Sequence, residues 1–145
     1  MNENRHWRVV QTVELAANSK EVWNTVGGFF TIHLWHPDIE ITEIPEDQTS
    51  ASAIRRILTF PGQPKTTEEL LHLDNENLHY SYKWHAGAWG EKVQNYCASI
   101  RVIDTYMSER CIMQWSSSFE YSEDAVSDFY WRGFAELQRL FPTNK

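Results

Sequence analysis

Few residues in this chain have the type and spacing that chemistry needs, and His36 is the first of them. An imidazole has an ordinary pKa of about 6.5, so His36 could donate a hydrogen bond or act as a general base, or it could be a structural residue at a helix end. The chain has no Gly-x-Ser-x-Gly elbow, no nucleophile triad and no recognisable pair of catalytic carboxylates. An enzyme built from these residues would therefore work by proton transfer and by positioning a flexible substrate.

Metal-binding patterns are weak. His33 and His36 are three residues apart, which suits a metal on a helix, but no third ligand and no His-Glu-x-x-His or Cys-x-x-Cys pattern accompanies them. We therefore expect neither a metal nor a cofactor. Cys97 and Cys111 are the only two cysteines, and residues 1–8 lack the apolar core of a signal peptide, so we expect both thiols to be reduced and buried in strands.

Aromatic and polar residues alternate along three strands that we expect in the second half of the chain. Tyrosine hydroxyls inside an apolar site need hydrogen-bond partners, and a ligand carbonyl or hydroxyl could be one of them. We expect these rings to line a cavity, with a filled core as the alternative. The residues on the shared apolar face of segments 78–85, 95–102 and 111–120 are Tyr80, Tyr82, Trp84, Tyr96, Met113, Trp115 and Phe119.

The elements that must position these residues follow one another in a simple order. Residues 9–15 predict a strand, and Asn18 or Ser19 offers an N-cap for a helix over 20–26 that ends at Gly27-Gly28. A second short helix is expected over 28–34, because the residue before Pro37 resists helical backbone angles. Turns then separate six further strands, over 39–45, 52–60, 66–73, 78–85, 95–102 and 111–120.

The last segment predicts a long amphipathic helix, with Ser122 as N-cap, Glu123 and Asp124 in the first turn and Pro142 after its end. Gly133 lies on its apolar stripe, where glycine costs about 1 kcal/mol relative to alanine, so it could give room to a ligand or to a packed ring. The stripe extends over about five turns and consists of Val126, Phe129, Tyr130, Gly133, Phe134, Leu137, Leu140 and Phe141.

These elements predict an α+β fold in which a curved antiparallel sheet of about seven strands surrounds the C-terminal helix. The 145 residues fit one domain, over 1–145. The formal net charge of −7 argues against nucleic acid and anionic membranes as partners, and no apolar run reaches the ~20 residues of a membrane span. We expect a cytoplasmic monomer or homodimer whose partner is a small hydrophobic molecule.

The order of elements, Gly27-Gly28, Trp35-His36-Pro37 and the strands around Glu68, Tyr80 and Tyr96 resemble the START-like (SRPBCC, helix-grip) superfamily, and within it the polyketide cyclase/dehydrase-like branch. The resemblance covers roughly residues 7–141. It implies a cavity between sheet and helix for a lipid- or polyketide-like molecule, but the same fold serves cyclases, receptors and carriers.

The resemblance also implies site residues. Trp35 would lie near the entrance of the cavity, as a wall or lid or as a packing contact. Independently of the resemblance, Trp89 on the loop 87–90 could cap the mouth or contact a partner. Arg55 and Glu68 match an arginine and a glutamate that face the interior in related proteins, either as an ion pair or as a grip for the polar end of a ligand. The turn at 61–64 does not fix the hairpin register, so the sequence does not decide whether Arg55 or Arg56 pairs with Glu68.

Three functions therefore compete: a binding module for a small hydrophobic or amphipathic molecule, a polyketide cyclase or dehydratase, and an interaction protein with a filled core. A polar group with a shifted pKa deep in an open pocket would favour the enzyme, with His36, Arg55 and Glu68 as candidates. An apolar pocket with paired charges would favour binding. A pocket smaller than about 300 Å³ would favour the filled core.

Overall fold

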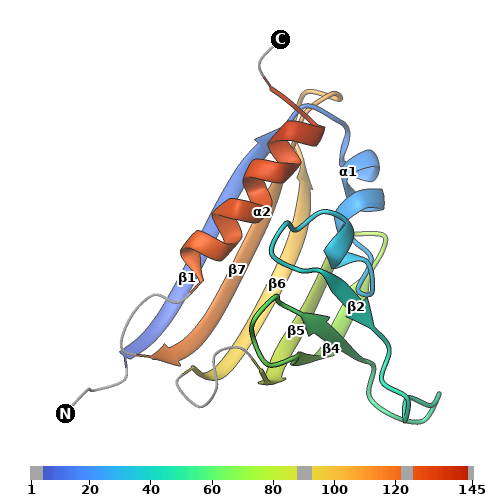
Figure 1. Ribbon diagram of the computed structural model, residues 1–145. Coiled ribbons are helices and arrows are strands. Elements are labelled where there is room, and N and C mark those ends of the chain that lie inside the picture. Colours follow the sequence, from blue (N-terminus) through green and yellow to red (C-terminus); the bar gives the residue numbers. More distant parts are fainter. Residues whose placement is uncertain (1–4, 88–92, 122–125, 144–145) are drawn as a thin grey trace.

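The computed structural model describes residues 5–87, 93–121 and 126–143 and shows a seven-stranded antiparallel sheet in the order β1-β7-β6-β5-β4-β3-β2 (Figure 1). The α+β fold predicted from the sequence is therefore confirmed. The strands are β1 (Arg5–Leu15), β2 (Ile41–Glu43), β3 (Arg55–Thr59), β4 (Thr66–Asp74), β5 (His79–Ala86), β6 (Gln94–Asp104) and β7 (Cys111–Tyr121). The helices are α1 (Ser19–Val26), the 3₁₀ turn η1 (Ile32–Leu34) and α2 (Ser127–Leu140).

Helix α1 begins and ends as the sequence predicts. The Asn18 side chain accepts a hydrogen bond from the Glu21 backbone N–H at 2.9 Å, which satisfies one of the free donors of the first turn. Gly27 follows the last residue, and a Cβ there would lie 2.3 Å from the Trp23 ring, so only glycine allows this close approach.

The second predicted helix is shorter than expected. Residues 28–31 form a turn of their own, in which both the backbone N–H and the hydroxyl of Thr31 donate to the Gly28 carbonyl at 3.3 Å. Helical geometry is then confined to Ile32–Leu34. Pro37 excludes any continuation, so this segment forms an irregular arm that crosses the open face of the sheet.

Helix α2 lies in front of β1 and β7 in Figure 1 and buries Tyr130, Gly133, Phe134 and Leu137. Its 14 residues make about four turns, one fewer than predicted. The stripe leaves the core at the last turn, where Leu140 is 42% exposed. The predicted N-cap Ser122 and the acidic residues Glu123 and Asp124 lie outside the described residues.

Strand alternation sets which side chains face the interior. β1 and β7 pair without interruption from Arg5–Tyr121 to Leu15–Cys111. In β6 the register shifts between Gln94 and Cys97, and Asn95 has a φ of 56°, the left-handed region that asparagine tolerates. Tyr96 still faces the interior, while the Asn95 side chain donates to the exposed carboxylate of Glu120.

The remaining expectations from the sequence are met in part. β2 and β3 are shorter than predicted, and Ile44 lies beyond the end of β2 and is exposed. Both thiols are free, but Cys97 is exposed and only Cys111 is buried, where desolvation raises its pKa to about 11. Neither α1 nor α2 has the length and apolar character that a membrane crossing requires.

Candidate functional site

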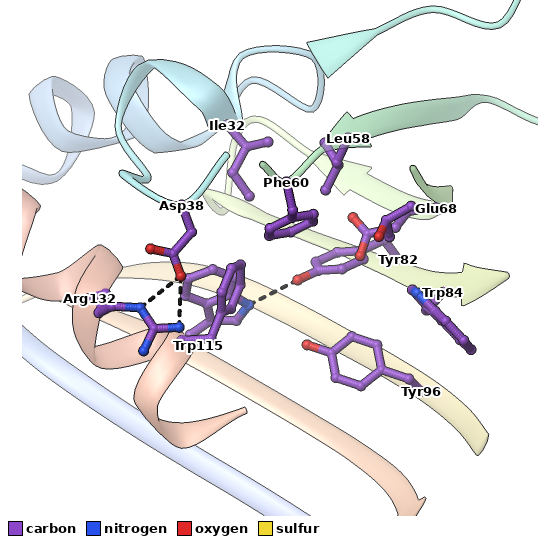
Figure 2. Close-up of a pocket in the computed structure, with 12 residues that line it drawn as sticks. Ile32, Asp38, Leu58, Phe60, Glu68, Tyr82, Trp84, Tyr96, Trp115 and Arg132 are labelled. Carbon is purple, nitrogen blue, oxygen red and sulfur yellow. Dashed lines mark hydrogen bonds and ion pairs between the residues drawn. The ribbon is translucent and has the colours of Figure 1, made fainter. Parts of the chain in front are cut away.

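A cavity of about 170 Å³ lies between the inner face of the sheet, the arm 28–40 and helix α2 (Figure 2). Aromatic rings make up half of its wall, and the polar groups include one carboxylate on the sheet, the Thr66 side chain, two tyrosine hydroxyls and an ion pair at the α2 side. The lining residues are Ile32, Asp38, Leu58, Phe60, Thr66, Glu68, Tyr82, Trp84, Tyr96, Trp115, Phe129 and Arg132.

The cavity is small because large rings fill most of the space under α2. Trp115 stacks on Tyr130 with ring centroids 4.1 Å apart and contacts Trp35 at 5.5 Å, and all three are buried. Its volume lies below the roughly 300 Å³ under which a filled core is favoured, so the cavity has no room for a drug-sized ligand. It is close to the ~150 Å³ that holds one benzene ring in an engineered apolar cavity. The space therefore suits one ring with a small substituent.

Five of the ten residues proposed as ligand contacts line this cavity, namely Glu68, Tyr82, Tyr96, Trp115 and Phe129. Trp35, Tyr80 and Met113 face the interior as predicted, but they belong to the packed core beside the cavity. Gly133 also lies off the cavity. A Cβ on this residue would be 2.8 Å from Cδ2 of His36 and 3.1 Å from Cζ3 of Trp35, so the glycine makes room for rings of the protein itself.

The interior arginine is Arg56, and the expectation for Arg55 is wrong. Arg56 lies directly opposite Glu68 in the β3–β4 register, so the two side chains share the inner face, whereas Arg55 lies opposite Glu69. The Arg56 Nε and Nη2 donate to Glu68 Oε1 at 2.9 and 2.7 Å, and Nη1 donates to the Phe29 carbonyl at 2.7 Å. Arg55 is 30% exposed and pairs with Asp47 at 3.0 Å.

Glu68 is the acidic group of the cavity wall. Burial raises its pKa, and the charge and hydrogen bonds of Arg56 act against that rise. The guanidinium also lies 4.2 Å from the Phe29 ring centroid and 4.8 Å from that of Tyr82, so aromatic rings surround the positive charge. The carboxylate is thus held in place by an ion pair while it borders the cavity.

His36 supports the cavity wall without lining it. Its ring stacks on Phe129 with centroids 4.0 Å apart. Nε2 lies 2.8 Å from the Phe129 carbonyl, which can only accept, and Nδ1 lies 3.1 Å from the Asp38 backbone N–H, which can only donate. Burial lowers the pKa of His36 to about 4, so the ring is neutral with its proton on Nε2. Because both nitrogens are engaged, His36 positions Phe129 and Asp38.

An ion pair at the cavity mouth was missed by the sequence analysis. Arg132 on α2 binds Asp38 of the arm with Nη2 and Oδ2 2.7 Å apart, and Figure 2 shows the pair at the side of the cavity next to Trp115. Arg132 is 51% exposed, and Asp38 is 25% exposed. The partners are 94 positions apart, so no local signal joins them. Trp89, the predicted cap of the mouth, lies outside the described residues.

The tyrosine hydroxyls at the cavity are engaged in two separate hydrogen bonds. The Trp115 indole N–H donates to the Tyr82 oxygen at 3.0 Å, and the hydroxyls of Tyr96 and Tyr130 bond to each other. Burial raises the pKa of Tyr82 and of Tyr96 well above the ordinary value, so both stay protonated. Among the described residues, no group of three or more His, Cys, Asp or Glu side chains is arranged to hold a metal ion.

A sheet wrapped around a C-terminal helix with a ring-lined cavity between them defines a helix-grip protein. Residues 6–139 match the family model described as polyketide cyclase/dehydrase and lipid transport, and the chain therefore belongs to that family. This confirms the resemblance seen in the sequence. No curated protein matches the chain in sequence.

Solved structures show the same fold at low sequence identity. The protein XoxI from Bacillus cereus is 23% identical with a TM-score of 0.81, over 92% of this chain and 94% of that one. The Zhui aromatase/cyclase from Streptomyces sp. R1128 is 14% identical with a TM-score of 0.74, over 97% and 99%. Norcoclaurine synthase from Thalictrum flavum, in complex with dopamine and hydroxybenzaldehyde, is 18% identical with a TM-score of 0.68, over 95% and 87%.

Proposed function

We propose that this protein binds one small, mainly apolar molecule, about the size of a single substituted ring, in the cavity between the sheet and α2. The observation that carries the proposal is the cavity itself. It is ring-lined, its volume is about 170 Å³, and its interior carboxylate is already paired with Arg56. An apolar space of this size next to a paired charge favours binding over chemistry.

The family supports the binding of an apolar molecule, and the volume of the cavity limits the size of that molecule. A long lipid chain or a fused polyketide exceeds the space that the rings of Trp115, Tyr130 and Trp35 leave open. The norcoclaurine synthase structure with a similar fold holds dopamine and hydroxybenzaldehyde, each of which contains one ring. Ligands of that scale suit the cavity of this chain.

A proton-transfer enzyme is the second candidate, and Glu68 is the observation that favours it. Its carboxylate borders the cavity, and burial raises its pKa, which is the direction that a general base requires. Two features make binding the better proposal: the carboxylate is committed to Arg56, and His36 has no free nitrogen to relay a proton. A probe that is chemically converted by the protein but not by Glu68→Gln would reverse this order.

The proposal is tested with ligands of graded size. Toluene, naphthalene and palmitate are titrated into ¹⁵N-labelled protein while the indole N–H resonances of Trp84 and Trp115 are followed. We expect saturable shifts with toluene and none with palmitate.

Native mass spectrometry of freshly purified protein, followed by solvent extraction, gives the mass of any molecule that the protein already carries.

A matched pair of variants tests the location. Leu58 lines the cavity, whereas its neighbour Ile57 lies on the opposite face of β3. Leu58→Phe fills the space with a ring and should weaken toluene binding at least about tenfold, whereas Ile57→Phe should leave it unchanged. Equal binding by both variants places the ligand elsewhere, and no binding of any probe to the wild type favours the filled core.

We further propose, from the sequence, that residues 1–145 act as one cytoplasmic ligand-binding domain in a monomer or homodimer. Size-exclusion chromatography with light scattering, in the presence and absence of the probe, distinguishes the two oligomeric states.

A further inference from the structure

Tyr82 has a hydroxyl proton whose direction follows from its neighbour. An indole N–H can only donate, so in the 3.0 Å contact with Trp115 the Tyr82 oxygen is the acceptor. The hydroxyl proton of Tyr82 must then point to a different acceptor. No hydrogen bond donated by Tyr82 is formed within the described part of the chain, although the residue is only 2% exposed.

The open side of this hydroxyl is the cavity. Tyr82 lines it, and Figure 2 shows the hydroxyl group directed toward Trp115 across the middle of the cavity. The neighbouring hydroxyls of Tyr96 and Tyr130 bond to each other rather than to Tyr82. A buried donor without an acceptor is costly, so a molecule that fills the cavity gains by offering an oxygen at this point.

The charges around the cavity select the kind of oxygen. Glu68 borders the same space, and its negative charge acts on Tyr82. A ligand carboxylate would bring a second negative charge into this enclosed region, where Arg56 already bonds Glu68 and the Phe29 carbonyl and Arg132 already pairs with Asp38. A neutral acceptor, such as a ketone, aldehyde, ester or amide carbonyl, avoids that penalty.

We infer that Tyr82 is the specificity-determining residue of the cavity and that the ligand is a neutral carbonyl compound with one ring, whose carbonyl oxygen accepts the Tyr82 hydroxyl proton. The inference rests on the proposed binding function and adds the chemical class of the ligand. The indole of Trp115 holds the Tyr82 oxygen in place, so the donor is oriented before the ligand arrives.

The test uses two probes of nearly the same shape. Acetophenone carries a carbonyl where α-methylstyrene carries a C=CH₂ group. Their dissociation constants are measured by NMR titration against the wild type, Tyr82→Phe and Tyr80→Phe. Tyr80 is the matched control, because it is a buried tyrosine on the same strand and face whose oxygen accepts from Arg56 Nη1 at 3.3 Å and which does not line the cavity.

We expect Tyr82→Phe to reduce the preference for acetophenone over α-methylstyrene by about three- to tenfold, the usual effect of one hydrogen bond. Tyr80→Phe should keep the wild-type preference. Comparing ratios between variants cancels the different hydration of the two probes. In the wild type, the infrared carbonyl band of bound acetophenone should move to lower frequency than in an apolar solvent, a measurement that stands even if Tyr82→Phe unfolds.

An unchanged preference in folded Tyr82→Phe, or a carbonyl band at its apolar-solvent position, overturns this inference while the binding function stands. Benzoate binding more tightly than acetophenone overturns the neutral character of the ligand. If neither ring compound binds the wild type, the proposed function fails, and this inference fails with it.

Discussion

At the residue scale, the cavity wall depends on the ion pair between Arg56 and Glu68. It ties β3 to β4 and also reaches the Phe29 carbonyl in the arm, so three segments meet at one guanidinium. Both side chains are buried, and each charge is tolerated only because the other is present. The pair therefore fixes the position of the carboxylate at the cavity more than it adds stability.

Arg56→Met should lower the free energy of unfolding by about 3–5 kcal/mol, because it leaves the Glu68 carboxylate buried without its cation. The double variant Arg56→Met/Glu68→Leu should recover most of the loss, since it removes both charges. The control is Arg55→Met, which breaks only the partly exposed pair with Asp47 and should cost less than about 1 kcal/mol. Urea denaturation measures all three. A larger loss for Arg55→Met than for Arg56→Met would contradict the β3–β4 register that places Arg56 on the inner face.

The same two arginines show where sequence reasoning stops. Alternation identifies the inward faces of β5, β6 and β7 because long runs of rings and polar residues keep a period of two. In β3 both neighbouring positions are arginine, so alternation gives no preference, and a slip of one residue exchanges the buried and exposed side chains. Only the pairing of Arg56 with Glu68 across the hairpin resolves the choice.

At the scale of elements, the crossing of α2 over the arm depends on Gly133. The helix approaches so closely that His36 and Trp35 occupy the place of a Cβ. Both rings are buried, and the His36 ring is held by two hydrogen bonds and by its stack on Phe129, so it cannot move away freely. Glycine at this position lowers the stability of the isolated helix, but it allows the helix to pack against the arm.

Gly133→Ala should therefore destabilise the protein by about 1–3 kcal/mol, although alanine favours a helix by about 1 kcal/mol in an open position. Ala135→Gly on the exposed face of the same helix measures the propensity effect alone and should cost about 1 kcal/mol. Thermal and urea denaturation provide the comparison. Stabilisation by Gly133→Ala would show that the arm yields and that the close approach is not required.

At the scale of the whole molecule, the sequence predicts the architecture far better than the size of the cavity. The strand segments, the capped α1 and the apolar stripe of α2 all follow from local periodicity and turn residues, whereas the pairing of β1 with β7 joins segments far apart in the sequence and does not. The cavity volume is a small difference between the space that the sheet encloses and the summed volumes of Trp35, Trp115 and Tyr130. The pair of Asp38 with Arg132 depends on how α2 and the arm meet, so local patterns cannot predict either feature.

His36 makes the stability of the whole molecule depend on pH. Its pKa is about 4 in the folded protein, where burial favours the neutral ring, against about 6.5 in the unfolded chain. Above pH 6.5 both states are neutral at this residue, and its contribution is constant. As the pH falls from 6.5 toward 4, the unfolded chain takes up a proton that the folded protein does not, so the free energy of unfolding decreases, in total by on the order of 3 kcal/mol.

Urea denaturation between pH 7 and pH 4.5 should show this loss in the wild type and a flatter profile in His36→Gln, whose amide cannot take up the proton. Acidic side chains titrate in both proteins, so the difference between the two profiles isolates His36. His33→Gln is the control, because His33 is only partly buried and bonds to the Thr42 hydroxyl, and it should follow the wild type. Parallel profiles for the wild type and His36→Gln would mean that the pKa of His36 is the same in the folded protein as in the unfolded chain, and would contradict the neutral buried ring.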